Sequence, residues 1–370
     1  MKRDYRLDVC KGVAILLVML GHCIVLNGLN ASDPFLYDGI KTVQMPLFML
    51  ISGLLLGKSY IKLAALSAGD LSCLRKDIID KSKRNALHYL LPFFSWFVVV
   101  YLFTYIRNGQ LSPVSFGREL KELLFQTDKG LWFLTTLFVI SLFVLWVQYI
   151  SDLLCRIIGR DCSKDRNHKS ENRKQIVKNE AVFLSLIFIL YLLFFLQSRS
   201  GFSLLSPSLS VMYMPFFVLG YLIGKYQEVI FEGMKSVYVK VAVLLLWTLF
   251  IAMIILFDLN QPALSPGVLF LQMFASLIGS LAIFLLVMII SNPQKKNVLS
   301  FLGGYTLEIY VVHFRFARLL KLGEKGFTFY SPQGLLWVLL QFLLMSILTF
   351  VSIWIINRIK PLRFLLFGKR

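Results

Sequence analysis

Charged side chains are scarce in this sequence, and acidic ones are the scarcest. Only 16% of the 370 residues are charged, whereas 57% are hydrophobic and 15% are aromatic. A soluble domain is typically about a quarter charged and just under half apolar. The shortage of charge therefore excludes a soluble enzyme and a disordered protein, and it favours a protein that lies in a lipid bilayer.

Acidic residues are outnumbered by basic ones, 20 against 39, which gives a formal net charge of +19. Such an excess can indicate a nucleic-acid binder, but those proteins gather their basic residues on one water-facing surface. Here Lys and Arg separate apolar runs instead. We therefore expect no nucleic-acid partner, and we interpret the charge as a signal of membrane topology.

Cysteine and histidine are also rare. The sequence has five cysteines and four histidines, with no Cys-x-x-Cys pair and no Cys/His cluster at the spacing of metal ligands. We predict neither a disulfide framework nor a bound metal. The first apolar run, 12–29, lacks a small-x-small cleavage site, so we expect it to be a retained span rather than a secretory signal.

Long apolar runs fill most of the chain. A helix needs about 20 residues to cross a hydrocarbon core of about 30 Å. Runs of this kind occur at about 12–29, 42–60, 85–106, 131–150, 181–197, 209–226, 238–257, 267–291, 298–319 and 333–358. They do not alternate in polarity as barrel strands do. The sequence predicts an all-α integral membrane protein with about ten transmembrane helices, surrounded by membrane lipids.

The basic residues between these runs predict the orientation. Assigning alternate connections to alternate sides places 29 of the 39 Lys and Arg residues on the side that holds both termini. Because cytoplasmic connections carry the excess of Lys and Arg, both termini should be cytoplasmic. By the same rule 151–180 should face the cytoplasm and 258–266 should face outward.

The first span carries three ionisable residues on one face. At about 100° per residue, His22 projects within roughly 20° of Lys11 and within roughly 40° of Asp8. His22 lies roughly 16 Å along the helix from Lys11, near the middle of the bilayer. Ionisable side chains at this depth are candidates for function. The alternatives are that Lys11 is a snorkelling anchor and His22 an interhelical hydrogen-bond partner.

Four short motifs follow one another along the chain. They are the Lys11-x10-His22 pair in the first span, MPLFMLISG at 45–53, LWFL at 131–134 and YTLEIYVVH at 305–313. In this order, and over a ten-helix layout, they resemble the membrane acyltransferase 3 family.

The resemblance implies the transfer of an acyl group, usually acetyl, from cytoplasmic acetyl-coenzyme A to a hydroxyl of a cell-surface polysaccharide or other glycan. The partners it implies are acyl-coenzyme A and a hydroxyl-bearing acceptor, and the location is the cell membrane, or the inner membrane of a bacterium. Many relatives also carry a C-terminal hydrolase-like domain. We expect residues 1–370 to form a single transmembrane acyltransferase domain without it.

His22 is the predicted catalytic base. A sugar hydroxyl is a poor nucleophile until its proton is removed, and imidazole has the unperturbed pKa closest to neutral. Asp8 belongs to the same catalytic face, but it lies roughly 21 Å from His22 by helical rise, too far for a hydrogen bond. We assign Asp8 to ordering the cytoplasmic mouth, together with Lys11 one turn away.

The acyl donor should enter from the cytoplasm, where its phosphates would meet Lys11, Lys83 and Arg84. The family's arginine pair before the third-helix proline is displaced here, because Tyr89-Leu90-Leu91 directly precedes Pro92. Trp132 is a further candidate for contact with the donor, although an interfacial aromatic anchor is the alternative.

Glu308 and His313, in the late-helix motif, are the candidates for acceptor binding. A structural ion pair is the alternative for Glu308, since a buried carboxylate needs a partner. For Pro46 and Ser52-Gly53 in the second span, the alternatives are a substrate path and close helix packing.

Two other functions fit a ten-helix protein. A transporter or flippase for a lipid-linked glycan would also need a midplane ionisable residue, and a non-catalytic assembly protein of the envelope would need neither donor nor acceptor. The alignment of His22 with the cytoplasmic Lys11 favours the enzyme. The acceptor hydroxyl, the length of the acyl group and the oligomeric state are left open by the sequence.

Overall fold

The computed structural model describes residues 4–27, 34–67, 70–108, 112–126, 130–159, 169–201, 203–204, 207–233, 236–257, 259, 266–320 and 331–369. These residues are predominantly helical and include no strand. They divide into two compact units, one comprising Met1–Ser52 with Tyr226–Arg370 and the other Gly53–Lys225. We describe each unit separately.

The first unit is built around α1 (Tyr5–Val25), whose N-terminus is capped by Asp4. The carboxylate of Asp4 accepts a hydrogen bond from the Arg6 backbone N at 3.0 Å, which satisfies one free N–H of the first turn. The other helices of this unit are the first part of α2 (Pro34–Leu66), α8 (Gln227–Gly233), α9 (Val237–Leu256), α10 (Pro266–Ile290), α11 (Val298–Gly304), α12 (Thr306–Val312), the 3₁₀ helix η3 (His313–Phe316), α13 (Pro332–Arg358) and α14 (Lys360–Phe367).

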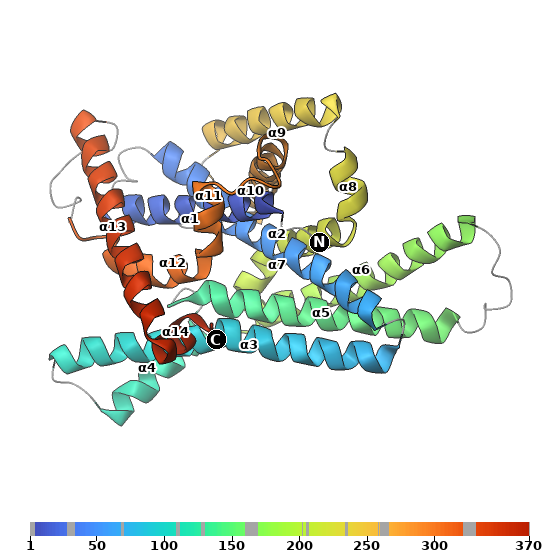
Figure 1. The fold of residues 1–370 in the computed structure, drawn as a ribbon, viewed down its shortest axis with the longest axis horizontal. Helices are drawn as coiled ribbons and strands as arrows, with labels where there is room; N and C mark the ends of the chain where they lie inside the picture. The colour runs from blue at the N-terminus through green and yellow to red at the C-terminus, as the bar shows by residue number, and fades with distance from the viewer. Residues whose placement is uncertain are drawn as a thin grey trace. The chain divides into compact units, whose positions relative to one another are not determined.

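The second unit contains the rest of α2 and five further helices among the described residues. In it α3 and α5 run side by side (Figure 1). The helices are α3 (Leu71–Asn108), α4 (Pro113–Phe125), α5 (Trp132–Gly159), α6 (Lys169–Arg199) and α7 (Pro207–Lys225).

Nine helices within the described residues are long and apolar enough to cross a membrane. They are α1, α2, α3, α5, α6, α7, α9, α10 and α13, and they coincide with nine of the ten predicted spans. The prediction of an all-α, multi-pass membrane protein is confirmed. The loop residues 160–168 and 260–265, on which part of the orientation prediction rests, lie outside the described residues.

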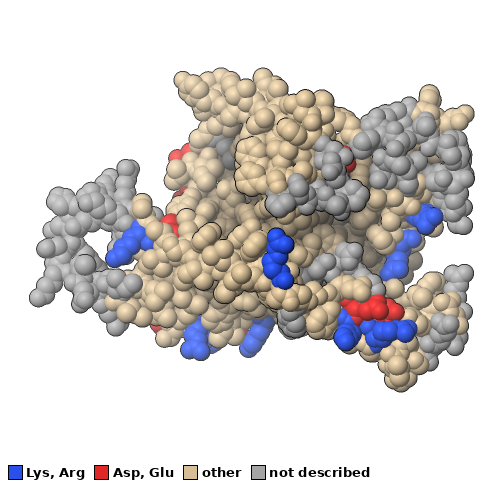
Figure 2. All heavy atoms as spheres, turned by 180° about the vertical axis from the view of Figure 1, so that it is seen from behind, with Lys and Arg blue, Asp and Glu red and all other residues tan. Residues whose placement is uncertain are grey.

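Apolar side chains cover much of the surface of the long helices. Only 17% of the most apolar window of α3 and of α6 is buried, against 72% for α2. Figure 2 shows one face of the molecule, on which uncharged residues predominate and Lys and Arg are few. The corresponding windows of α9 and α13 are 22% buried. Apolar surfaces of this kind are unfavourable in water, and we infer that these four helices face lipid.

The ninth predicted span, 298–319, is not one helix. It is divided into α11, α12 and η3, with Tyr305 between α11 and α12 at φ −114° and ψ 17°. The start of α11 is fixed by a capping box, in which the side chains of Asn297 and Ser300 each bond the other residue's backbone N at 2.8 Å. Broken backbone at membrane depth occurs where it is buried in protein or lines a cavity.

The first half of this broken segment is held against α1 by backbone contact. A Cβ added to Gly303 would lie 1.8 Å from the Asp8 carbonyl oxygen, and one added to Gly12 would lie 2.1 Å from the Leu299 oxygen. The two helices therefore approach as closely as glycine allows, and α11 lies across α1 (Figure 1).

A second close approach lies within the other unit. A Cβ on Gly53 would meet the Phe217 oxygen at 1.9 Å, and one on Gly57 would meet the Tyr221 oxygen at 2.2 Å. These residues form a Gly-x-x-x-Gly pair on α2 that lets α7 pack backbone to backbone. The packing alternative for Gly53 is therefore what the structure shows, and α2 stays helical through Pro46.

Candidate functional site

Two histidines from distant parts of the chain meet in the first unit. His22 lies near the end of α1 and His313 is the first residue of η3. Their ring centroids are 5.3 Å apart with an interplanar angle of 38°. His22, the predicted base, and His313, a predicted acceptor-binding residue, therefore form one site, which we call the histidine pair.

The hydrogen bond made by His313 fixes its tautomer. Its Nδ1 lies 2.8 Å from the Ile309 carbonyl oxygen, and because a carbonyl can only accept, Nδ1–H is the donor. In the neutral ring Nε2 then carries the lone pair. That atom is buried and has no hydrogen-bond partner among the described residues, in a residue that is 1% exposed. His313 thus presents a free basic nitrogen inside the protein.

His22 presents a similar free atom. Its Nδ1 is also buried without a hydrogen-bond partner among the residues that the structure describes. The edge of Phe314 packs against the His22 ring, with centroids 5.2 Å apart and an angle of 89°. Buried polar atoms are normally satisfied, so two open imidazole nitrogens at one place indicate a site for a polar ligand.

Two buried amides, which the sequence analysis missed, hold the segment that carries His313. The Asn27 side chain donates to Cys23 O at 2.8 Å and to Ala317 O at 3.0 Å, which ties the end of α1 to the end of η3. The Gln341 side chain on α13 donates to Phe316 O at 2.6 Å and accepts from Leu320 N at 2.9 Å. The only sequence signal was a polar amide within or beside an apolar run.

The predicted partnership of Asp8 and Lys11 is confirmed. Lys11 Nζ lies 2.7 Å from Asp8 Oδ1, one turn away on α1, and the Asp8 side chain is 7% exposed. Fourteen residues of helix separate Asp8 from His22, or roughly 21 Å of rise. Asp8 therefore neutralises Lys11 at one end of α1 and makes no contact with the histidine pair.

Glu308 has the structural ion pair that the sequence left as an alternative. Its buried side chain, 1% exposed, pairs with Lys369 near the C-terminus. The start of α1 lies in the same region, because Tyr5 lines one pocket with Glu308 and Lys369. The Tyr5 backbone N also donates to Pro293 O, in the connection after α10, at 3.0 Å. The start of α1, the connection after α10 and the C-terminal segment thus gather at one end of this unit, as their assignment to one membrane side requires.

The remaining predicted site residues belong to the second unit. Lys83 and Arg84 lie on α3 and are exposed. Trp132, at the start of α5, stacks on Tyr213 of α7 with centroids 5.5 Å apart and an angle of 21°. Their predicted roles in donor binding stay predictions.

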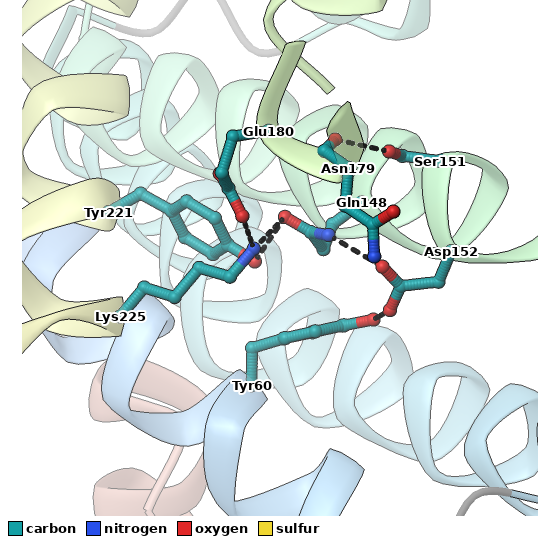
Figure 3. Close-up of polar contacts among 8 residues, drawn as sticks. All are labelled: Tyr60, Gln148, Ser151, Asp152, Asn179, Glu180, Tyr221 and Lys225. Atoms are coloured by element: carbon teal, nitrogen blue, oxygen red, sulfur yellow. Dashed lines mark hydrogen bonds and ion pairs between the residues drawn. The ribbon is translucent and has the colours of Figure 1, made fainter. Parts of the chain in front are cut away.

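A buried polar network joins four helices of the second unit (Figure 3). Gln148 lies at its centre, donating to Asp152 Oδ1 at 2.9 Å and accepting from Tyr221 and Lys225 at 3.1 Å each. Lys225 and Glu180 form an ion pair, and the Asp152 carboxylate accepts hydrogen bonds from Tyr60 and Gln148. We interpret the network as one that fixes α2, α5, α6 and α7 together.

Comparison with known proteins agrees with the motif analysis. A protein-family model described as an acyltransferase domain matches residues 4–358. Nodulation protein NolL of Mesorhizobium japonicum (strain LMG 29417 / CECT 9101 / MAFF 303099) is 27% identical over 161 residues, which cover 42% of this chain and 36% of the relative. No solved structure matches the chain. Since the family match spans nearly the whole sequence, the chain belongs to the acyltransferase domain family.

Proposed function

We propose that this protein is an integral membrane O-acyltransferase that moves an acetyl group from acetyl-coenzyme A to a hydroxyl of a cell-surface polysaccharide or glycan. One observation carries the proposal. The histidine pair places two imidazole rings with their centroids 5.3 Å apart, and each ring has a buried nitrogen without a hydrogen-bond partner among the described residues. Such groups can accept and return a proton away from bulk water. Membership of the acyltransferase domain family supports the reaction class.

The chemistry follows from what acyl transfer to a hydroxyl requires. His22 takes the proton of the acceptor hydroxyl while the oxygen of that hydroxyl attacks the thioester carbonyl carbon. The tetrahedral intermediate then collapses, the carbon–sulfur bond breaks, and the imidazolium returns the proton to the leaving thiolate. None of these proposed reaction steps requires a metal ion.

His313 sits beside the base, where the acceptor must lie. Its Nδ1–H is occupied by Ile309 O, so only Nε2 can face a substrate, and it can accept a hydrogen bond from a second hydroxyl of a sugar. We assign His313 to orienting the acceptor hydroxyl toward His22. Glu308, paired with Lys369, belongs to the end of the unit where α1 begins, and its predicted acceptor contact remains part of the proposal.

The donor is proposed to approach from the end of α1 that carries Asp8 and Lys11. The Asp8–Lys11 ion pair is proposed to order this mouth. Lys83 and Arg84 belong to the other unit and are exposed, and their predicted contact with the donor phosphates remains part of the proposal. The predicted contact of Trp132 with the donor also remains part of the proposal. The membrane is proposed to be the cell membrane, the inner one in a bacterium, with the termini in the cytoplasm.

The test is acyl transfer by the purified full chain in detergent or nanodiscs. Labelled acetyl-coenzyme A is supplied with the de-O-acetylated surface glycan of the source cells, and transfer is read as label and as the mass of one acetyl group on the glycan. We expect transfer and slow hydrolysis of the thioester without acceptor. A protein that neither binds coenzyme A nor hydrolyses acetyl-coenzyme A would overturn the enzyme proposal.

One observation favours the alternative, a transporter or flippase for a lipid-linked glycan. The break between α11 and α12 resembles the discontinuous helices that form substrate sites in transporters. The same assay separates the two functions, because a transporter would move the glycan across a vesicle membrane without consuming acetyl-coenzyme A.

A further inference from the structure

A pocket of about 500 Å³ opens in the first unit, at the end where α1 begins. Parts of the chain that are far apart in sequence supply its walls: the start of α1, the α10–α11 connection, the α11–α12 break and the C-terminal segment. The lining residues that bear on its chemistry are Tyr5, Lys296, Phe301, Tyr305, Glu308, Arg363 and Lys369.

The pocket has an excess of positive charge. Three cations, Lys296, Arg363 and Lys369, line it against one carboxylate, Glu308, among the described residues. Glu308 is committed to Lys369 by their ion pair. The charge of the other two cations is therefore not compensated by a lining carboxylate, and an anion is the ligand that this arrangement favours.

Arg363 is the most specific of these cations. Its Nε is buried and has no hydrogen-bond partner in the part of the chain that the structure describes. A guanidinium presents a planar fork of N–H donors that matches the oxygens of a phosphate. A buried donor without a partner is costly, so an open Arg363 indicates a ligand that completes it.

Aromatic rings also line the pocket. Lys369 Nζ lies 5.7 Å from the centroid of the Tyr305 ring, and Lys296 Nζ lies 5.7 Å from that of Phe301. Tyr5 adds a third ring. Flat aromatic faces beside cations suit a ligand that joins a planar base to phosphates, and the volume lies in the range of small-molecule sites.

We propose that this pocket binds the phosphate groups of a phosphate ester, and that the ester is the nucleotide end of the acyl donor. The identity of the donor rests on the proposed function. The cationic pocket itself rests on Lys296, Arg363 and their surroundings. Anionic lipid headgroups carry the same phosphate chemistry, so the experiment separates the two sources.

The experiment measures binding of coenzyme A and of adenosine 3′,5′-bisphosphate to the purified full chain by calorimetry. The variants are Arg363→Gln and Lys296→Glu, and the matched control is Lys295→Gln, whose position is exposed and outside the pocket. Since Lys296 is exposed, its variant should fold even if Arg363→Gln does not. We expect both pocket variants to weaken binding of both ligands about 10-fold or more, and the control to leave it unchanged.

A lipid arm completes the test. Each protein is also titrated with vesicles of phosphatidylglycerol in phosphatidylcholine. Unchanged nucleotide binding in both pocket variants would overturn the nucleotide assignment, whether or not lipid binding falls. If the variants transfer acetyl and bind the nucleotides as the wild type does, the pocket is excluded as the nucleotide site and the proposed function stands. If the pocket variants weaken nucleotide binding but the wild-type protein transfers no acyl group, the nucleotide site is supported and the proposed function is contradicted.

Discussion

The imidazole rings of His22 and His313 lie with their centroids 5.3 Å apart, although the two residues come from opposite ends of the sequence. His22 belongs to α1, and His313 begins the 3₁₀ helix η3 directly after α12. The pair gives the first unit two buried imidazole nitrogens that have no hydrogen-bond partner among the described residues, and the following predictions test what that arrangement does.

Replacement of His22 tests the base. We expect His22→Ala to lower acetyl transfer by about 10²-fold or more, the usual scale for loss of a general base, while leaving coenzyme A binding intact. Initial rates with the purified variant and calorimetric binding provide the measurement. His88→Ala, a histidine of α3 outside the site, is the control and should transfer at the wild-type rate. Near wild-type transfer by His22→Ala would show that another group takes the proton.

Replacement of His313 tests whether the two histidines act together. We expect His313→Ala to lower transfer by about 10-fold or more and to raise the apparent KM for the acceptor, because the group that orients the hydroxyl is lost. The double variant should lose little more activity than His22→Ala alone, since the residues act as a unit. Additive losses in the double variant would contradict a shared role.

Replacement of Asn27 tests the tie between α1 and η3. Asn27→Ala leaves the Ala317 carbonyl without this donor, so we expect about 1–3 kcal/mol less stability. Because the positions of both histidines depend on the tie, kcat should fall while the KM for acetyl-coenzyme A stays constant. Asn292→Ala, at an exposed position, is the matched control. Wild-type kcat in Asn27→Ala would limit Asn27 to a structural role.

Adjacent glycines provide a test of the helix contact. A Cβ on Gly303 would meet the Asp8 carbonyl oxygen at 1.8 Å, whereas one on Gly304 would meet nothing within 4 Å. We expect Gly303→Ala to lower stability by about 1–3 kcal/mol through separation of α11 from α1, and Gly304→Ala to have little effect. Thermal unfolding in detergent measures both. Equal midpoints for the two variants would show that the close approach is not required.

The predicted orientation can be tested with one native and one introduced cysteine. Cys73 is exposed on the side predicted to be cytoplasmic, and Gly117 on α4 is exposed on the opposite predicted side, with open space around its Cβ. An impermeant maleimide should label Gly117→Cys on intact cells and should label Cys73 only after permeabilisation. Labelling of Cys73 on intact cells would show that the predicted orientation is wrong.

The apolar runs and their basic connections determined the spans. A membrane helix satisfies its own backbone, so about 20 apolar residues predict a span without reference to neighbours. The face shared by Asp8, Lys11 and His22, and the pairing of the first two, follow from helical geometry and were also predictable. The ordered motifs indicated the family, which the match to residues 4–358 confirms.

Only the tertiary structure decided the rest. The run at 298–319 is apolar throughout most of its length and predicts one span, whereas the structure divides it at Tyr305 and packs Gly303 against the backbone of α1. The meeting of His22 with His313, the partner of Glu308 and the amide ties of Asn27 and Gln341 all join residues far apart in sequence. Helical periodicity orders residues within one element, whereas these contacts depend on how elements pack, which no local pattern specifies.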